Sequence, residues 1–129
     1  CQGDSPKMVI RIKSKDRLQD SVTPSSLNTE TDIINLADQD DDYIVEGFID
    51  LGNMQDGDKV VITTYIAVDG TNQRVVDKLE IAESPEIPVV RFPATTLPYN
   101  AKLRITINQT AGTLRSFPYA FIVQVMEQI

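Results

Sequence analysis

The feature that most constrains this chain is a two-residue period in its hydrophobicity. Apolar and polar residues alternate cleanly across Leu103–Ile107, and a longer segment, Val60–Val68, places its aliphatic residues mostly on one face. Alternation of this kind is typical of β-strands, which turn one apolar face to a core and one polar face to solvent. No segment shows a helical period with capping residues. The pattern therefore predicts an all-β chain.

Turn residues divide the chain into about eight strands. The strongest hairpin signal is Asp69–Asn72, because its Asp-Gly pair supplies the positive φ that a tight turn needs. Pro85 and Pro88 bracket another break, and Gly112 marks a further turn. Strands without helices to cover them are expected to pack as two sheets. We therefore predict an antiparallel β-sandwich, either a jelly roll or an immunoglobulin-like fold.

Three segments allow more specific predictions. Tyr43–Leu51 is apolar on both faces, which is typical of a strand that is central or lies at an interface. Val89–Phe92 is predicted to be a short strand that Pro93 ends. Ser116–Gln128 carries apolar residues on one side and predicts a last strand that ties the end of the chain into a sheet.

The first part of the chain differs from the rest. We predict an N-terminal arm over residues 1–28 and the β-sandwich domain over residues 29–129. The arm is polar apart from one alternating island, which predicts a short strand at residues 8–13. The stretch that follows, Ser14–Asn28, is rich in charges and in Thr, Pro and Ser, and it predicts a long loop or flexible arm.

A strand of this kind is not stable alone and must pair with another strand. It can fold back onto its own sheet, or it can add to the exposed sheet edge of a neighbouring molecule. The sequence supports the two possibilities almost equally. The second would make the arm a clasp between subunits, with the partner-binding residues Met8, Val9, Ile10, Arg11 and Ile12.

Charge argues against several classes of partner. The chain has 19 acidic and 12 basic residues, a net charge of −7, and its basic residues are scattered. Nucleic-acid-binding proteins usually show a basic face, so we expect neither nucleic acid nor an anionic membrane as a partner. The acidic balance is most simply a source of solubility. No apolar stretch is long enough for a membrane span.

The residues that are missing argue against catalysis. The chain has no histidine and one cysteine, Cys1, which excludes Ser-His-Asp and Cys-His catalysis and the usual zinc sites. We therefore expect no enzymatic activity, no cofactor and no metal. Paired carboxylates, as glycosidases use, are the catalytic alternative. The acids considered for that role are Glu46, Asp50, Glu80, Glu83 and Glu86.

Two acidic segments could instead bind a cation. Asp38–Asp42 offers four carboxylates for Ca²⁺, but it lacks the glycine and the terminal Glu of the helix-loop-helix calcium pattern. A solvated loop between two strands is the favoured interpretation. Asp56-Gly57-Asp58 is interpreted first as a turn and only then as a pair of ligands.

Several turn-and-strand motifs resemble a known group of proteins. They are Val45–Leu51, Gly57–Ile62, Tyr65-Ile66 with Val68–Asn72, and Gln109–Gly112 with Arg115–Tyr119. Over this region, Ile44 to Phe121, the chain resembles small, uncharacterised β-sandwich proteins of tailed phages and archaeal viruses. The resemblance implies a virion-associated role as a capsid, decoration or tail component. It carries over no catalytic or ligand-binding residue, and it does not extend to the N-terminal third.

These observations favour a non-enzymatic structural or assembly protein, located in a virion or outside the cell. Its expected partners are further copies of itself, other virion proteins, or both. The alternative is an extracellular binding or adhesion module that is anchored to a surface through an acylated Cys1. The competing interpretation of Cys1, which we favour, is that residues 1–7 are a leader remnant and that Met8 is the native start.

Overall fold

The computed structural model describes residues 10–128, and these residues form an all-β fold with no helix. There is accordingly no helix among them that is long and apolar enough to cross a membrane. The eight strands are β1 (Ile10–Val22), β2 (Glu30–Asn35), β3 (Tyr43–Asp50), β4 (Lys59–Ala67), β5 (Gln73–Ala82), β6 (Val89–Leu97), β7 (Lys102–Ala111) and β8 (Phe117–Gln128).

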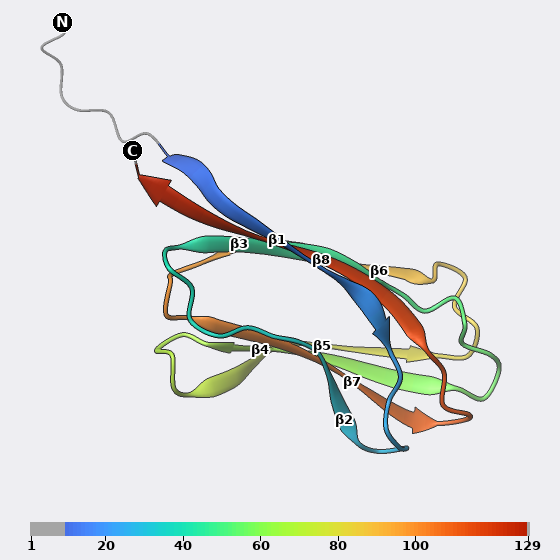
Figure 1. Ribbon diagram of the computed structural model, residues 1–129. Helices are drawn as coiled ribbons and strands as arrows, with labels where there is room; N and C mark the ends of the chain where they lie inside the picture. The colour runs from blue at the N-terminus through green and yellow to red at the C-terminus, as the bar shows by residue number, and fades with distance from the viewer. Residues whose placement is uncertain (1–9, 129) are drawn as a thin grey trace, which may run out of the picture.

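The strands form two four-stranded antiparallel sheets that pack face to face (Figure 1). Sheet A has the order β1-β8-β3-β6, and sheet B has the order β2-β7-β4-β5. The first strand therefore pairs with the last, the second with the last but one, and so on inward to the β4–β5 hairpin. A long hairpin rolled up in this way is a jelly roll. The predicted β-sandwich is confirmed, and the strand order excludes the immunoglobulin-like arrangement.

The core lies where the inward faces of the two sheets meet. Alternate residues of β3 and β8 point inward, and Tyr43, Phe117 and Phe121 are completely buried there. Opposite them lie the inward-facing aliphatic residues of sheet B, among them Val60, Ile62, Leu103, Ile105 and Ile107. The β3 strand is central, between β8 and β6, as its two apolar faces predicted. Its outward Phe48 remains 50% exposed.

A glycine makes room on β3 for Phe121, one of the three bulkiest fully buried side chains. Gly47 is directly opposite Phe121 of β8. A Cβ atom at Gly47 would overlap the ring of Phe121 and the carbonyl oxygen of Ala120. The ring of Phe121 therefore occupies space that any other residue at position 47 would fill, and it packs at 5.3 Å, between ring centroids, from Phe92 of β6.

The N-terminal segment differs from its prediction. The strand expected at residues 8–13 continues to Val22, so the prediction of a loop is wrong for residues 14–22. Residues 8 and 9 lie outside the described residues. The sequence pattern missed the continuation because β1 is exposed on both faces over most of its length and therefore needs no apolar stripe. Its main-chain hydrogen bonds to β8 hold it in place.

A proline is placed differently from its prediction as well. Pro93 was expected to end a strand at Phe92, but β6 continues through it to Leu97. The pairing of β6 with β3 shifts register between Val45 and Gly47, close to this proline. An edge strand needs only half of its N–H groups for pairing, so a proline at a bulge is tolerated there.

Two predicted turns are confirmed. Asp69–Asn72 connects β4 to β5, and Gly70 adopts a φ of +79°. The Asp69 carboxylate accepts hydrogen bonds from the N–H groups of Asn72 and Thr71, which lowers its pKa to about 2. Gly57, in the turn before β4, adopts a φ of +92°.

Gly47→Ala should lower the free energy of unfolding by about 2–3 kcal/mol, because the new methyl group overlaps both a backbone oxygen and the Phe121 ring. Urea unfolding followed by circular dichroism measures this loss. Gly57→Ala is the comparison, since no atom lies within 4 Å of a Cβ placed there and the cost is limited to about 1 kcal/mol of backbone strain. Equal losses in the two variants would contradict the proposed packing.

Candidate functional site

The predicted partner-binding segment lies only partly within the described residues. Ile10, Arg11 and Ile12 open β1 and lie opposite Gln128, Glu127 and Met126 of the same chain. Met8 and Val9 are outside the described residues. Of the two pairings that the sequence left open, the structure therefore contains the one in which residues 10–12 fold back onto their own sheet. Contact of this segment with a neighbouring copy stays a prediction.

These residues belong to a ribbon that projects from the sandwich. The pairing of β8 with β3 begins at Val125, opposite Tyr43, and the Met126 N–H still donates to the Asp42 carbonyl at 2.9 Å. Beyond that point β8 is paired with β1 alone, and Figure 1 shows the two strands extending together past the rest of their sheet.

The ribbon exposes apolar side chains. Ile10 is 50% exposed and Ile12 is 45% exposed. Between them, Arg11 forms an ion pair with Glu127 at 2.5 Å. An exposed pair of this kind contributes little stability, so the ribbon is held mainly by its main-chain hydrogen bonds. A two-stranded ribbon with exposed apolar residues is marginally stable unless another strand or surface covers it.

The acidic segment Asp38–Asp42 lies beside this ribbon. Asp40 is 3.9 Å from Lys13 of β1, and Asp38 is 3.8 Å from Lys102 of β7. Asp42 accepts a hydrogen bond from the Tyr99 N–H at 3.0 Å. The carboxylates are thus divided among separate partners. Within residues 10–128, no three potential metal-ligating side chains come together.

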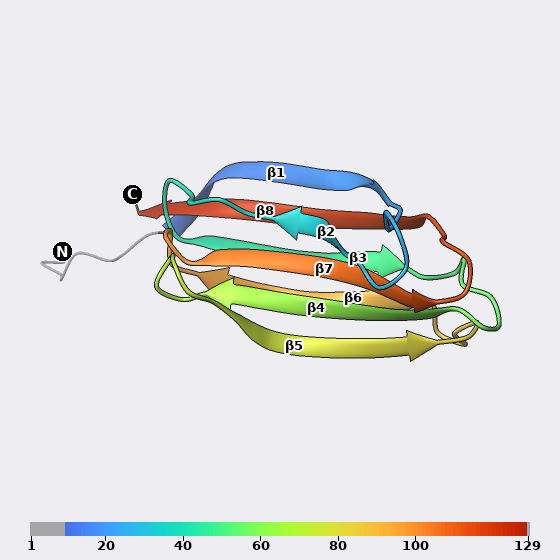
Figure 2. The same cartoon turned by 90° about the horizontal axis from the view of Figure 1, so that it is seen from below.

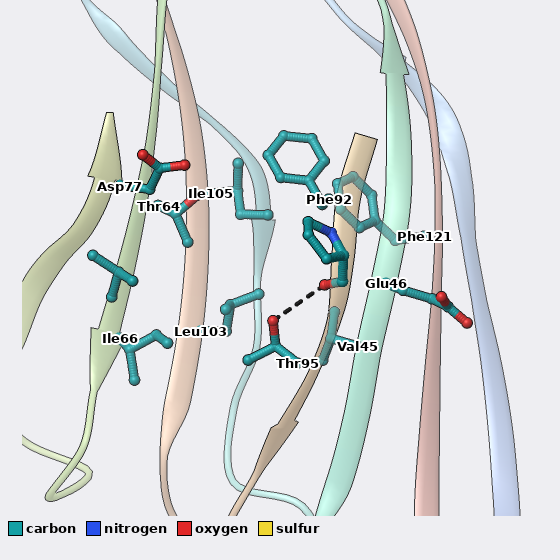
Figure 3. A pocket seen from close by; sticks show the side chains of 12 residues that line it. Val45, Glu46, Thr64, Ile66, Asp77, Phe92, Thr95, Leu103, Ile105 and Phe121 are labelled. Carbon is teal, nitrogen blue, oxygen red and sulfur yellow. Dashed lines mark hydrogen bonds between the residues drawn. The ribbon is translucent and has the colours of Figure 1, made fainter. Parts of the chain in front are cut away.

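The carboxylates considered for catalysis do not converge. An apolar cavity opens between the two sheets, and Glu46 of sheet A points away from it (Figure 3). The acid that lines the other side of this cavity is Asp77 of sheet B, so the two carboxylates do not face each other. Asp50 accepts a hydrogen bond from the Gly52 N–H, and Glu83 accepts one from the Gly57 N–H. Glu80 lies opposite Val61, on the outer face of sheet B. Glu46 and Asp50 thus face outward on β3, Glu80 faces outward on β5, and Glu83 lies beside the turn before β4, so these four acids do not gather at one site within residues 10–128.

The cavity is small and mainly apolar. It has a volume of about 160 Å³ and opens between the β5 side of sheet B and the β6 side of sheet A (Figure 3). Its walls include Val45, Ile66, Val76, Phe92, Leu103 and Ile105. Pockets for small molecules usually measure about 300–1,000 Å³. This cavity has room for about one side chain.

A larger groove lies on the outer face of sheet A. It has a volume of about 390 Å³, and its walls come from β1, β3, β6 and β8. Phe48, which is 50% exposed, and Val89, which is 48% exposed, are its main apolar residues, together with Pro118. The groove is shallow, but its volume is sufficient for a small ligand.

One buried charge was missed by sequence reasoning. Asp58 ends the predicted Asp-Gly-Asp turn, but its side chain is buried at 1% exposure and accepts a hydrogen bond from Arg115 Nε at 2.9 Å. The N–H groups of Gln55 and Thr113 also donate to it. Burial by itself would raise the pKa of Asp58, but these hydrogen bonds outweigh burial and lower it. Because Arg115 is far away in sequence, no local pattern indicates this contact.

A second polar cluster covers the outer face of sheet B. Glu30 of β2 accepts hydrogen bonds from Thr106 of β7 and Tyr65 of β4. Those two bonds lower the pKa of Glu30, and the bond to Glu30 raises the pKa of Tyr65. Arg104 lies 5.4 Å from the centre of the Tyr65 ring and pairs with Asp32 at 2.6 Å. The cluster fastens the short strand β2 to its sheet.

The sheet edges are the remaining candidate surface. Each sheet ends in two strands with one unpaired side, β1 and β6 in sheet A and β2 and β5 in sheet B. Unpaired edges are templates for pairing with another chain unless charge, proline, bulges or short length protect them. The β6 edge contains Pro93 and a bulge, and β2 has only six residues. The β1 edge carries a row of cations, Arg11, Lys13, Lys15 and Arg17.

Comparison with known proteins gives a likeness in fold. No protein-family model matches the sequence, and no curated protein sequence matches it. A chain from the disulfide-linked pili of Bacillus endospore appendages is similar over 97% of this chain and 95% of its own length. Its sequence identity is 16% and its TM-score is 0.59. At this identity the likeness shows the fold alone.

Two further solved structures are less similar. VP2 from the subviral particle of infectious bursal disease virus has 17% identity and a TM-score of 0.44. It covers 97% of this chain but 37% of its own length, so this chain spans well under half of that protein. PirA has 10% identity and a TM-score of 0.45, and it covers 88% of this chain and 99% of its own length. Neither likeness supports an inference about function.

Asp58→Asn should lower the free energy of unfolding by about 2–3 kcal/mol at neutral pH, because it removes the charge from a buried acceptor of three hydrogen bonds. The pKa of Asp58 is lower in the folded state than the ordinary value of 3.8. Its stabilising contribution is therefore complete above that pH and is lost as the pH falls through the folded-state pKa. Urea unfolding from about pH 7 to about pH 3 measures the difference between the two proteins.

Asp56→Asn is the matched control, since Asp56 is exposed in the same turn. It should change the free energy of unfolding by less than about 0.5 kcal/mol at any pH. If the loss in Asp58→Asn were as large in acid as at neutral pH, the charge of Asp58 would not be its source.

Proposed function

We propose that this protein is a non-enzymatic structural subunit that assembles with further copies of itself or with other virion proteins. The observation that carries the proposal is the projecting β1–β8 ribbon, with Ile10 and Ile12 about half exposed at its end. We propose that the segment Met8–Ile12 acts as a clasp, which contacts a sheet edge of a neighbouring subunit. The main-chain groups supply the affinity, and the apolar side chains supply buried area.

Several properties support a structural role over a catalytic one. The chain has no histidine, and Glu46, Glu80 and Glu83 lie on different parts of the surface. The apolar cavity between the sheets has room for about one side chain. The fold is also similar to that of the endospore appendage chain, which forms pili, and that likeness covers nearly the whole of both chains. The fold is thus compatible with a subunit of an extracellular polymer.

We propose a virion component, such as a capsid, decoration or tail protein, as the more specific function. Support for it comes from the resemblance of the segment Ile44 to Phe121 to β-sandwich proteins of tailed phages and archaeal viruses. An extracellular polymer of one subunit type would use the same ribbon and sheet edges as a virion component. The proposed mechanism of assembly is therefore the same in a virion and in an extracellular polymer.

A surface binding module is the second candidate, and the groove at Phe48 and Val89 favours it. Such a module would act as a monomer. Binding of a ligand in the groove should be weakened at least tenfold by Phe48→Ala, measured on a glycan or small-molecule array. Arg91→Ala, on the same face but outside the lining of the groove, is the control. An array without any bound ligand would count against this candidate.

Removal of residues 1–13 should lower the mass of the assembly, and light scattering of the full chain and the truncated chain measures it. The cut falls at the bulge between Ile12 and Ser14, so Ser14–Val22 keep their pairing with β8. The sandwich should therefore remain folded while the exposed end of β1 is removed.

A version that lacks only residues 1–7 is the matched control, because it retains Met8–Ile12. It should assemble as the full chain does. If the truncation at residue 13 left the mass unchanged, the clasp would be wrong. If every version were monomeric, self-assembly would be wrong and the binding module would become the leading candidate.

A further inference from the structure

The β5 edge of sheet B is built differently from the other three edges. It has ten residues and contains no proline, and its one bulge against β4 lies at Val76, at the end of the segment considered below. All of its residues except Ile81 are exposed, and Val75 and Val76 are each 58% exposed. In contrast to β1, whose charges are mainly positive, β5 carries two cations and two anions. This edge is long enough for a second strand and has no strong net charge to repel one.

The position of β5 explains its exposure. Figure 2 shows that the β5 edge of sheet B extends past the β6 edge of sheet A. Leu79 lies opposite Ile62, a core residue, and therefore faces inward, yet it is 40% exposed. Sheet A does not cover this part of sheet B. Leu79 is thus left partly uncovered on the inward face of the outermost strand.

A symmetric pairing of β5 with the β5 of a second copy has few possible registers. Two copies related by a twofold axis form one continuous sheet only if their inner faces lie on the same side. Opposite residues of an antiparallel pair share a face. The axis must therefore pass through a residue that lies opposite itself.

The charges on β5 select among these registers. A centre at Val76 places Arg74 opposite Lys78 of the second copy, which brings like charges together. Centres at Asp77, Lys78 and Glu80 place each of those charged residues opposite itself. Centres at Val75, Leu79 and Ile81 avoid these contacts, and of the three only the Leu79 centre places residues of opposite charge opposite each other.

The Leu79-centred register forms two kinds of favourable contact, an opposite-charge pair and an apolar pair. Lys78 lies opposite Glu80 of the second copy, and the symmetry repeats this opposite-charge pair on the other side of the axis. Both residues are on the outer face, since they lie opposite Thr63 and Val61 of β4. On the inner face, Leu79 meets its own copy, and Ile81 lies opposite Asp77. Cross-strand pairs of opposite charge and of apolar residues each stabilise a sheet.

We infer that β5 is a homotypic interface, in which residues 76–82 pair antiparallel with the same residues of a second copy about a twofold axis at Leu79. The pairing joins two copies of sheet B into one eight-stranded sheet. Because β5 extends past β6, the β6 edges of the two copies stay apart. The interface rests on the proposed structural function and names a second contact for it, which uses none of the residues of the clasp.

A single cysteine at position 79 tests the axis directly. In the full chain with Cys1→Ser, Leu79→Cys places two thiols on directly opposite residues, whose Cα atoms are about 4.5–5.5 Å apart. That separation suits a disulfide. Mild oxidation should therefore convert most of the protein to a covalent dimer, measured on a non-reducing gel.

Val75→Cys is the matched control, because Val75 is on the same strand and is more exposed than Leu79. In this register the two copies of residue 75 are more than about 20 Å apart, so the covalent dimer should form at least tenfold more slowly. Equal rates at positions 75 and 79, or no cross-link at position 79, would overturn the interface.

Charge reversal supplies a second, independent test. Lys78→Glu, added to the Leu79→Cys variant, should slow cross-linking at least tenfold because it faces Glu80. The double change Lys78→Glu with Glu80→Lys restores opposite charges and should restore the rate. Lys59→Glu, on the inner strand β4 of the same sheet, should have no effect. Failure of the double change to restore the rate would overturn the register.

The clasp and the β5 interface can fail separately. If cross-linking at position 79 fails while removal of residues 1–13 still lowers the assembly mass, the β5 interface is wrong and the clasp stands. If cross-linking follows the charge changes while the truncation has no effect on the mass, the β5 interface stands and the clasp is wrong.

Discussion

The burial of one face of each sheet against the other is the interaction on which this structure depends. Main-chain hydrogen bonds hold each sheet together, but a four-stranded sheet of this length is stable in water only if its apolar face is covered. The central strands β3 and β8 of sheet A, with Tyr43, Phe117 and Phe121, supply the aromatic half of that contact. Gly47 of β3 leaves the space that the ring of Phe121 occupies. The polar contacts of Asp58 and Glu30 then fix the loops and the short strand around this core.

The packing of the two sheets also determines which strand edges stay exposed to other molecules. Sheet A carries β1 at one side of the sandwich, and sheet B carries β5 at the other (Figure 2). Each of these strands has one free edge and is poorly covered on its inward face. A closed barrel would have no such edges, whereas a sandwich leaves four and must protect or use them. Because β2 has six residues and β6 contains Pro93, we propose that association uses the longer edge strands β1 and β5.

The two proposed contacts differ in their physical basis. The clasp relies on the exposed end of the β1–β8 ribbon, where Ile10 and Ile12 are uncovered. The β5 interface relies on backbone pairing in the register that places Lys78 opposite Glu80 of the second copy. The clasp joins two different surfaces, so it can be repeated from one copy to the next. The β5 interface joins a surface to itself, so it is complete once two copies have paired. Together they would produce an extended assembly of paired subunits.

The sequence by itself determined the all-β class, most strand positions, the hairpin at Asp69–Asn72 and the absence of histidine-based chemistry, because these follow from the local period, turn residues and composition. The tertiary structure decided the strand order, which depends on pairing between distant segments. It also decided that Ser14–Val22 is a strand, since an exposed edge strand is held by backbone bonds that leave no pattern in its side chains. The buried pair of Asp58 and Arg115 and the uncovered face of β5 likewise arise from how the two sheets are placed, and neither has a local signal in the chain.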